Sequence, residues 1–335
     1  MALGKDNVLL VIFLNLFKSR KRPPRRLFLF GIFILRLVER LRKKTVALDL
    51  ARFERSQWLD SHQSPEVNRH KPTESEKVDL VFVVTRKDFE VLEYSLPSAI
   101  KSLRSMSLKC IKLIVPQVDI EECERIFGKY DSRIQILNEN EILSSMDRVI
   151  LKEKFGFKYT WVLQQVLKVV AVLSSESDYV LIVDADTILL RERNWVNAFG
   201  QQLLQPSEEF NPDYYSFLKQ FGFCESSPEF TLVTHHMFFQ REFMMDALLK
   251  LQLSSVSELI SLINEKLINT SPSPICIDYE FYGQYMLKFQ KARVVLEPWS
   301  NIAISISHLK TICNSPTRLK ILGFFYNSAS FHSWS

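Results

Sequence analysis

An apolar segment, residues 179–183, ends in two carboxylates one residue apart, Asp184 and Asp186. A short continuous run of aliphatic and β-branched residues is typical of a fully buried strand in an α/β sheet. In open α/β sheets ligands bind at the carboxyl ends of the strands, where both carboxylates would lie. Neighbouring carboxylates repel each other unless a cation lies between them, and Mg²⁺ and Mn²⁺ prefer oxygen ligands. The segment therefore predicts a divalent-metal site that receives a diphosphate, the alternative being a strand that ends in an Asx-type turn.

Strand and helix patterns alternate through the part of the chain that precedes this segment. Strands are expected at residues 78–85, 111–115 and 134–137, and helices at residues 88–103 and 119–130. Such alternation is typical of the α/β class, with a mostly parallel sheet flanked by helices on both faces. The 335 residues can form one large domain or two smaller ones.

Positive charge is concentrated at the amino terminus. Residues 1–44 contain 12 Lys or Arg and 2 acidic residues, a net charge of +10, whereas residues 45–335 contain 31 and 36, a net charge of −5. Two apolar stretches, 8–17 and 27–35, are shorter than the roughly 20 residues that span a bilayer. Cationic and apolar residues together suit an interfacial anchor on an anionic membrane. The alternatives are a signal peptide, a nucleic-acid-binding arm or a basic surface helix. A signal peptide is disfavoured because no small-residue cleavage site follows, and nucleic-acid binding is disfavoured because the rest of the chain is acidic.

Several common kinds of site are absent from the sequence. The 8 glycines form neither the Gly-x-Gly-x-x-Gly fingerprint of dinucleotide binding nor a P-loop, and there is no Gly-x-Ser-x-Gly or His-Glu-x-x-His motif. The 5 cysteines are widely spaced and form no Cys-x-x-Cys pair, as expected for reduced core residues of a cytosolic protein. A metal-bridged diphosphate therefore stays the favoured ligand.

A helix is expected over residues 161–170, directly before the Asp184 strand. Gln165 and Lys168 are three residues apart and share one face of it. If that face lies over the sheet edge, Lys168 can reach a phosphate and Gln165 a sugar or base. The alternative is an ordinary amphipathic helix with two solvated polar residues.

Five segments, taken in order, resemble a bacterial family of predicted glycosyltransferases that belongs with the GT-A nucleotide-sugar enzymes and is distantly similar to family 8. They are residues 84–88, residues 161–168 with Leu-Gln-Gln-Val-Leu-Lys, residues 183–187 with Asp-Ala-Asp, residues 234–238 with His-His-Met, and residues 278–283. The resemblance covers residues 78 to about 310. It implies a GT-A-like nucleotide-diphospho-sugar transferase fold and transfer of a sugar from a nucleoside-diphosphate-sugar donor to an acceptor hydroxyl.

The resemblance also implies roles on the donor side. The divalent cation, Mn²⁺ or Mg²⁺, would be bound by Asp186, with Asp184 holding the ribose or a metal-bound water. A third metal ligand in the GT-A pattern is often a His after a late strand, and His308 stands in about that place, although the Gly and Pro-Trp that follow it in family 8 are missing. The donor itself would contact Thr85, Asp88, Gln165, Lys168 and Asp184.

On the acceptor side, three residues are candidates for catalysis. Asp278 and Glu280 lie in an expected helix, where either carboxylate could act as general base, the alternative being that they cap the helix. The family favours Glu at the position of Asp278, so the carboxylate of this chain extends less far from the backbone. His235 and His236 follow an apolar run, and in extended backbone only one of them can face the site; His236 is the predicted one.

The predicted organisation is a membrane-associating segment (1–44), a linker (45–77), a GT-A-like catalytic domain (78–310) and a C-terminal tail (311–335). The expected location is cytoplasmic, peripheral at the inner face of the membrane, with a glycan or lipid-linked acceptor. Two other classes stay open: a haloacid-dehalogenase-like phosphatase, which also has a strand ending in Asp-x-Asp, and a non-catalytic relative of the transferases. The sequence leaves open the donor sugar and base, the acceptor, the stereochemical outcome and the oligomeric state.

Overall fold

The computed structural model describes residues 77–332, apart from residues 198, 208–210, 225–229, 267–274 and 298. The predicted membrane-associating segment and nearly all of the predicted linker lie outside the described residues. Within the described part, no helix is both long and apolar enough to cross a membrane.

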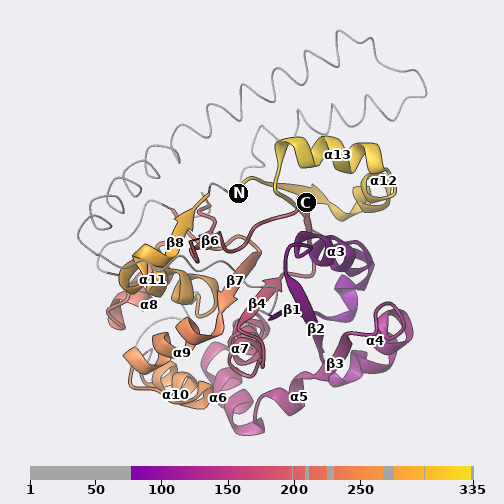
Figure 1. Ribbon diagram of the computed structural model, residues 1–335. Coiled ribbons are helices and arrows are strands. Elements are labelled where there is room, and N and C mark those ends of the chain that lie inside the picture. The colour runs from indigo at the N-terminus through magenta and orange to yellow at the C-terminus, as the bar shows by residue number, and fades with distance from the viewer. Residues whose placement is uncertain are drawn as a thin grey trace.

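A five-stranded sheet with the order β3-β2-β1-β4-β7 forms the centre of the molecule (Figure 1). Its strands are β1 (Lys77–Val83), β2 (Ser107–Val115), β3 (Ile134–Asn138), β4 (Tyr179–Val183) and β7 (His236–Gln240). The pairs among β1, β2, β3 and β4 are parallel, whereas β7 runs antiparallel to β4 with His236 opposite Val183. The predicted α/β class with a mostly parallel sheet is confirmed.

Helices cover both faces of this sheet. One face carries α3 (Phe89–Ser102) and α4 (Ile120–Phe127). The other is covered by α5 (Glu139–Ile142), α6 (Ser145–Phe155), α7 (Tyr159–Leu173), α8 (Pro212–Gln220), α9 (Arg241–Lys250), α10 (Val256–Lys266) and α11 (Tyr279–Phe289). Short 3₁₀ turns lie at Arg86–Asp88, Gln117–Asp119, Gly156–Lys158, Lys291–Arg293 and Ile306–His308.

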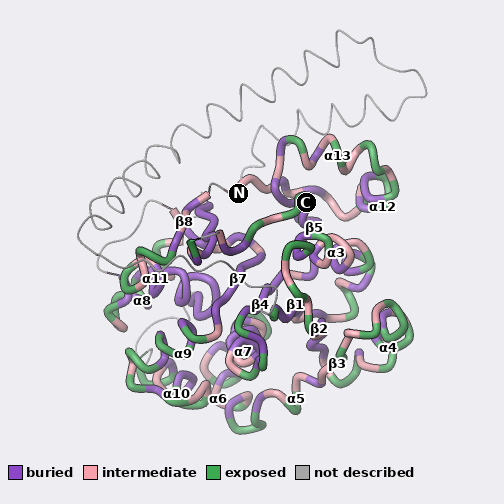
Figure 2. Tube along the Cα trace, viewed as in Figure 1, coloured by how far each residue is buried: buried purple, intermediate pink, exposed green. Residues whose placement is uncertain are grey.

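The strands read as continuous apolar runs because both of their faces are buried. In β1, Leu80 and Phe82 pack toward α3 and α4, while Val81 between them packs toward α7. Successive side chains of a strand point to opposite faces, so a sheet covered on both sides needs apolar residues at every position. Figure 2 shows the resulting buried centre, with exposed residues on the outer surfaces of the helices.

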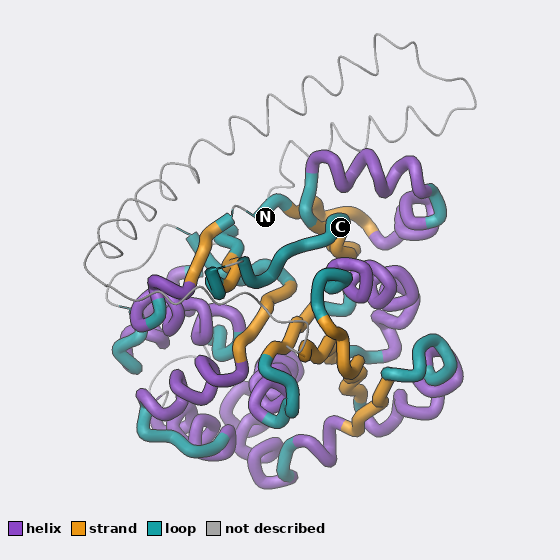
Figure 3. The backbone as a smooth tube through the Cα atoms, in the orientation of Figure 1, coloured by secondary structure: helices purple, strands orange, loops and turns teal. Residues whose placement is uncertain are grey.

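Two smaller sheets lie beyond β4. β5 (Thr187–Leu189), β10 (Ser328–His332) and β9 (Asn301–Ser305) form one in the order β5-β10-β9, and β6 (Gln202–Leu204) pairs with β8 (Val294–Leu296) in the other (Figure 3). Two helices, α12 (Leu309–Cys313) and α13 (Pro316–Phe325), connect β9 to β10. The predicted domain boundary at residue 310 falls within α12. The residues of the predicted tail include β10, which is the middle strand of the three-stranded sheet.

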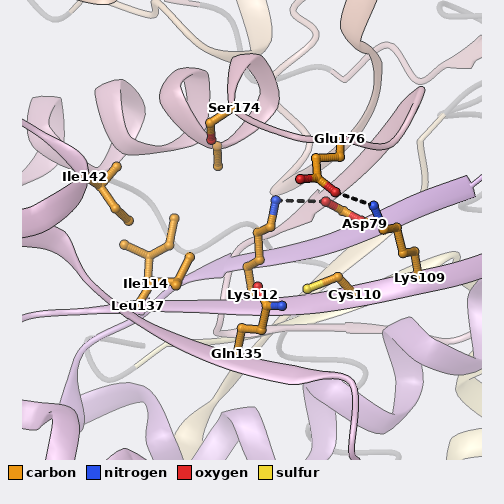
Figure 4. Close-up of a pocket in the computed structure, with 11 residues that line it drawn as sticks. Asp79, Lys109, Cys110, Lys112, Ile114, Gln135, Leu137, Ile142, Ser174 and Glu176 are labelled. Atoms are coloured by element: carbon orange, nitrogen blue, oxygen red, sulfur yellow. Dashed lines mark hydrogen bonds and ion pairs between the residues drawn. The ribbon is translucent and has the colours of Figure 1, made fainter.

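A cavity of about 320 Å³ opens beside the early residues of β1 and β2 (Figure 4). Its buried carboxylate, Asp79, pairs with Lys112 at 2.8 Å and accepts hydrogen bonds from Ser175 and Ser177 at 2.8 and 2.7 Å. Burial alone would raise the pKa of Asp79, but the bonds from Lys112 and the two serines outweigh it and lower this pKa. Asp184 lies four residues beyond Val180, the partner of Asp79 in β4, so the cavity is at the far end of the strands from the Asp pair.

Lys112→Met is expected to destabilise the protein by about 3 kcal/mol at neutral pH, because it leaves the buried Asp79 carboxylate without its cation. A carboxyl with a lowered pKa stabilises the fold above its unfolded pKa and loses that contribution as pH falls through its folded pKa, so the penalty should shrink in acid. Chemical denaturation at several pH values measures both effects. Lys109→Met in the same cavity is the control, since Lys109 pairs with the exposed Glu176 and should leave the unfolding midpoint nearly unchanged. Equal effects of the two substitutions would contradict this view of Asp79.

Candidate active site

Asp184 and Asp186 lie at the carboxyl end of β4, as predicted. The backbone turns directly after the strand, where the Thr187 amide donates to the Asp184 carbonyl oxygen at 3.0 Å. The Asp184 amide donates to the carbonyl oxygen of His235 at 2.8 Å, which joins this turn to the residue just before β7. The turn therefore fixes the backbone of both acids relative to two strands.

The Asp184 side chain is held by three residues from three other segments. Lys168 Nζ of α7 lies 2.7 Å from Asp184 Oδ1, the Tyr279 hydroxyl of α11 donates to the same oxygen at 2.8 Å, and His235 Nδ1 lies 3.4 Å from Oδ2. Lys168 also contacts Asp278 Oδ2 at 3.1 Å, and its ammonium lies over the Tyr279 ring. Lys168 is therefore a buried cation shared by two carboxylates.

The opposite charges of Asp184 and Lys168 lower the pKa of the first and raise the pKa of the second. Burial would raise the pKa of Asp184, but the charges of Lys168 and His235 outweigh it and hold this pKa well below its usual range. Burial would likewise lower the pKa of Lys168, and the negative charge of Asp184 raises it instead. Both groups are thus ionised at neutral pH, and each stabilises the charged form of the other.

Asp186 faces a histidine from the end of the chain. His332 Nδ1, in the last residue of β10, lies 3.1 Å from Asp186 Oδ2, and the Phe331 amide donates to the Asp186 carbonyl oxygen at 2.8 Å. The predicted metal ligand His308 is placed differently: it follows β9, and its Nδ1 lies 3.1 Å from the Ser307 hydroxyl. β9 and β10 are parallel with Ser305 opposite His332, so His308 lies beyond the end of that pairing.

The carboxylate oxygens of Asp186 and the ring nitrogen of His332 are suitable ligands for a divalent cation such as Mn²⁺. Within the described residues, no three His, Cys, Asp or Glu side chains are grouped so as to hold a metal ion. A small hard cation that serves a phosphate substrate typically takes only one or two carboxylates from the protein and completes its shell with water and phosphate oxygens. A carboxylate and an imidazole with 28% and 10% of their side-chain surface exposed fit such a partial set.

Thr85 and Asp88, predicted to contact the donor, lie at the carboxyl end of β1 beside the Asp pair. The Thr85 hydroxyl donates to Asp88 Oδ2 at 3.0 Å. Burial raises the pKa of Asp88, and the charge of Asp186 adds to that rise. Asp88 is therefore close enough to Asp186 to sense its charge.

Gln165 has both ends of its amide engaged. Its Nε2 donates to the Ile275 carbonyl at 3.1 Å, and its Oε1 accepts from the Ile277 amide at 2.8 Å. These bonds fix the segment that leads into Asp278, so in this structure Gln165 aligns backbone.

Asp278 and Glu280, the predicted general bases, are both buried. Asp278 contacts Lys168 and accepts from the Cys276 thiol at 3.2 Å. Glu280 is fully buried, and four groups donate to it: the hydroxyls of Thr231 and Tyr215, the Leu232 amide and the Gln284 amide. Burial raises the pKa of Glu280, although these bonds oppose the rise. As placed, Glu280 anchors the segment before β7 to α11.

His235 and His236 point to different places. His235 has φ of 58°, in the left-handed region, and its side chain reaches Asp184. His236, the predicted catalytic histidine, is buried, with its Nε2 2.7 Å from Gln205 Oε1. Burial, helped by the charge of Arg193, lowers the pKa of His236 to about 3, so its imidazole is neutral. The structure thus brings His235, rather than His236, to the Asp pair.

Three residues of this site were not predicted from the sequence. They are His332, Tyr279, which donates a hydrogen bond to Asp184, and Trp299, whose ring centroid lies 5.6 Å from that of His235. Tyr279 lies between two acids that were singled out, so its place in that motif was a usable signal. His332 follows the sequence Ser-Ala-Ser-Phe, which is short and carries little strand pattern.

Comparison with known proteins gives one family and several structures. A family of unknown function, DUF6492, matches residues 76–204, a range that includes Lys168, Asp184 and Asp186. No curated protein matches the chain in sequence. Among solved structures, mouse xyloside xylosyltransferase 1 in its apo form is similar over 76% of this chain and 97% of its own, with 12% identity and a TM-score of 0.40. The galactosyltransferase LgtC, in complex with donor and acceptor sugar analogues, is similar over 76% of this chain and 86% of its own, with 10% identity and a TM-score of 0.41.

Proposed function

We propose that this protein is a metal-dependent glycosyltransferase of the GT-A type, which moves a sugar from a nucleoside-diphosphate-sugar donor to a hydroxyl of a glycan or lipid-linked acceptor. The observation that carries the proposal is the convergence on Asp184. Lys168, His235 and Tyr279 come from three separate segments of the resemblance, and all three contact this carboxylate. Residues spread over more than a hundred positions thus form one polar site at the carboxyl end of β4, where open α/β sheets bind ligands.

Asp186 and His332 would hold the divalent cation, Mn²⁺ or Mg²⁺. When bound, this ion would act as a Lewis acid that neutralises charge on the departing diphosphate. In the transfer itself, the bond between the anomeric carbon and a diphosphate oxygen breaks with its electron pair left on the diphosphate. A bond to the acceptor oxygen forms, and the acceptor hydroxyl loses its proton.

The chain's own residues orient these partners. Lys168 contacts Asp184 and keeps it ionised, and Asp278 contacts the same ammonium. Asp278 thus acts here as a positioning residue, and Glu280 as an anchor of the segment that carries His235. The place of the Asp pair in the chain supports a transferase over the phosphatase alternative, because the pair follows β4, after three other strands of the main sheet, whereas the phosphatase motif opens its domain.

The proposed location is the inner face of a membrane, with residues 1–44 as a peripheral anchor. Their net charge of +10 and their apolar stretches support attachment to anionic lipid, where each Lys or Arg near the surface contributes about 1 kcal/mol. Such attachment would bring the site to lipid-linked or cell-surface acceptors.

His332→Ala is expected to raise the Mn²⁺ concentration needed for half-maximal release of nucleoside diphosphate from the donor by at least about tenfold, because one metal ligand is lost. His308→Ala is the matched control and should leave that concentration unchanged. The measurement is metal-dependent release of UDP or GDP from a panel of nucleotide sugars, with chelator as the blank. A stronger effect of His308→Ala would restore the ligand set expected from the sequence. Absence of metal-dependent release, or of transfer, with every donor would overturn the proposed function.

A further inference from the structure

Four buried polar atoms, on His236 and on three residues near it, have no hydrogen-bond partner. In the part of the chain that the structure describes, the buried side-chain atoms that lack a hydrogen-bond partner are Arg193 Nη2, Trp195 Nε1, Gln205 Nε2 and His236 Nδ1. Buried polar groups are nearly always paired, and an unpaired one costs about 1–3 kcal/mol. Four of them on neighbouring residues indicate a site that a ligand or water completes.

Arg193, Trp195 and Gln205 lie around the His236 imidazole. Gln205 contacts its Nε2 at 2.7 Å, and the Trp195 ring packs edge-on against it with centroids 5.6 Å apart. Arg193 is near enough for its charge to lower the pKa of His236. The side chains of Trp195, Gln205 and His236 are each at least nine-tenths buried. Packing fixes the indole of Trp195, which stacks on Phe238 with an angle of 6° between the rings.

The unpaired atoms of the cluster, as placed, are three hydrogen-bond donors and one acceptor. Arg193 Nη2 and Trp195 Nε1 can only donate. With the Gln205 amide as placed, His236 Nε2–H donates to Gln205 Oε1, which leaves Gln205 Nε2 as a donor and His236 Nδ1 as an acceptor. Exchanging the amide N and O reverses both roles, and the His236 Nδ1–H then has the Thr234 backbone as its partner. In either assignment the cluster offers at least two donors, on Arg193 and Trp195, and one acceptor.

Such a set suits neutral hydroxyl groups. A hydroxyl donates one hydrogen bond and accepts others, whereas a carboxylate or an ionised phosphate only accepts and would face the lone pair of the acceptor. The site also has no net charge to attract an anion, because Arg193 Nη1 pairs with Glu297 at 2.5 Å and the His236 imidazole is neutral.

One side chain, Trp299, links the cluster to the Asp pair. Its ring centroid lies 6.3 Å from that of His236 and 5.6 Å from that of His235, and His235 contacts Asp184. In a nucleotide-sugar donor the sugar is bonded directly to the diphosphate, so a diphosphate at Asp186 and His332 leaves its sugar within reach of this neighbourhood.

We propose that Arg193, Trp195, Gln205 and His236 form the subsite that binds the hydroxyl groups of the donor's sugar and so selects a neutral sugar. This inference rests on the proposed function, since it assumes a nucleotide-sugar donor. It assigns to His236 the role of a binding residue for the sugar.

Trp195→Phe tests the subsite by removing one N–H group while keeping an aromatic ring on Phe238. The measurement is the affinity of each nucleotide sugar, UDP-glucose, UDP-N-acetylglucosamine and GDP-mannose, beside that of its nucleotide in the presence of Mn²⁺. The affinities of UDP and GDP themselves should not change. The nucleotide sugar that wild type binds more tightly than its nucleotide should lose about three- to tenfold in affinity, the range for one hydrogen bond to an uncharged group. Gln205→Leu should act in the same direction. Trp161→Phe, at the start of α7, makes the same chemical change elsewhere and should have no effect.

Thermal unfolding without ligand gives a second readout. Trp195→Phe removes an unpaired buried donor, so the melting temperature should stay the same or rise even as sugar binding weakens. If UDP and GDP bind but Trp195→Phe and Gln205→Leu leave the preference for the nucleotide sugar intact, the cluster holds water only and the subsite is refuted. If no nucleotide binds to the wild type, the proposed function itself fails, which is a separate result.

Discussion

Asp186→Asn should lower kcat/KM for metal-dependent sugar transfer by about a thousandfold, the scale of several kcal/mol of lost charge stabilisation at a departing group. The substitution keeps the size of the side chain and removes the negative charge that faces His332. The partly exposed position should make the effect on stability small. The measurement is the initial rate of transfer or donor hydrolysis at saturating Mn²⁺, together with the melting temperature.

Asp213→Asn is the control for Asp186→Asn, since Asp213 is exposed at the start of α8 and should leave the rate unchanged. An Asp186→Asn variant that folds normally and keeps more than about a tenth of the wild-type rate would contradict a metal-binding role for Asp186.

Lys168→Met should destabilise the protein by about 3–5 kcal/mol, because it leaves the buried Asp278 and the partly buried Asp184 without the cation they share. The free energy of unfolding from chemical denaturation measures this loss. Because Asp184 also loses the partner that orients it, the activity that remains should fall further than the folded fraction does.

A double substitution separates this charge effect from a simple loss of packing. Asp278→Asn added to Lys168→Met removes one of the two stranded charges, so the double variant should regain part of the lost stability. Lys152→Met, at an exposed position of α6, is the control. If Lys168→Met were as stable as Lys152→Met, or if Asp278→Asn gave no recovery, the shared ion pair would not be what holds Asp184.

The strands and helices of the main sheet were predictable because their hydrophobic patterns are strong. β1 and β4 lie between two layers of helices, and such burial requires the continuous apolar runs that the sequence shows. The same reasoning placed the Asp pair at the carboxyl end of β4, where the structure has it. β10 was not foreseen, since Ser328, Ala329 and Ser330 are small and carry no alternating pattern, although β5 and β9 pair with them.

Contacts within the site were only partly predictable. Spacing placed Gln165 and Lys168 on one face of α7, but it could not show that Lys168 reaches two carboxylates while Gln165 bonds to backbone. The prediction that His236 faces the site assumed a regular extended backbone. The positive φ of His235 breaks that regularity, so the alternation of side chains does not hold there. Asp278 and Glu280 looked like accessible bases because a motif carries no information on burial, which depends on how α11 packs.

The most direct test of the central claim is a calorimetric titration of UDP and GDP, and of their sugars, into the full-length protein with Mn²⁺ and with chelator, for wild type and Asp186→Asn. The proposed function predicts that at least one nucleotide binds to the wild type only when metal is present, and that Asp186→Asn abolishes this binding. Failure of all nucleotides to bind with metal, or binding that is indifferent to both metal and Asp186, would contradict the transferase account.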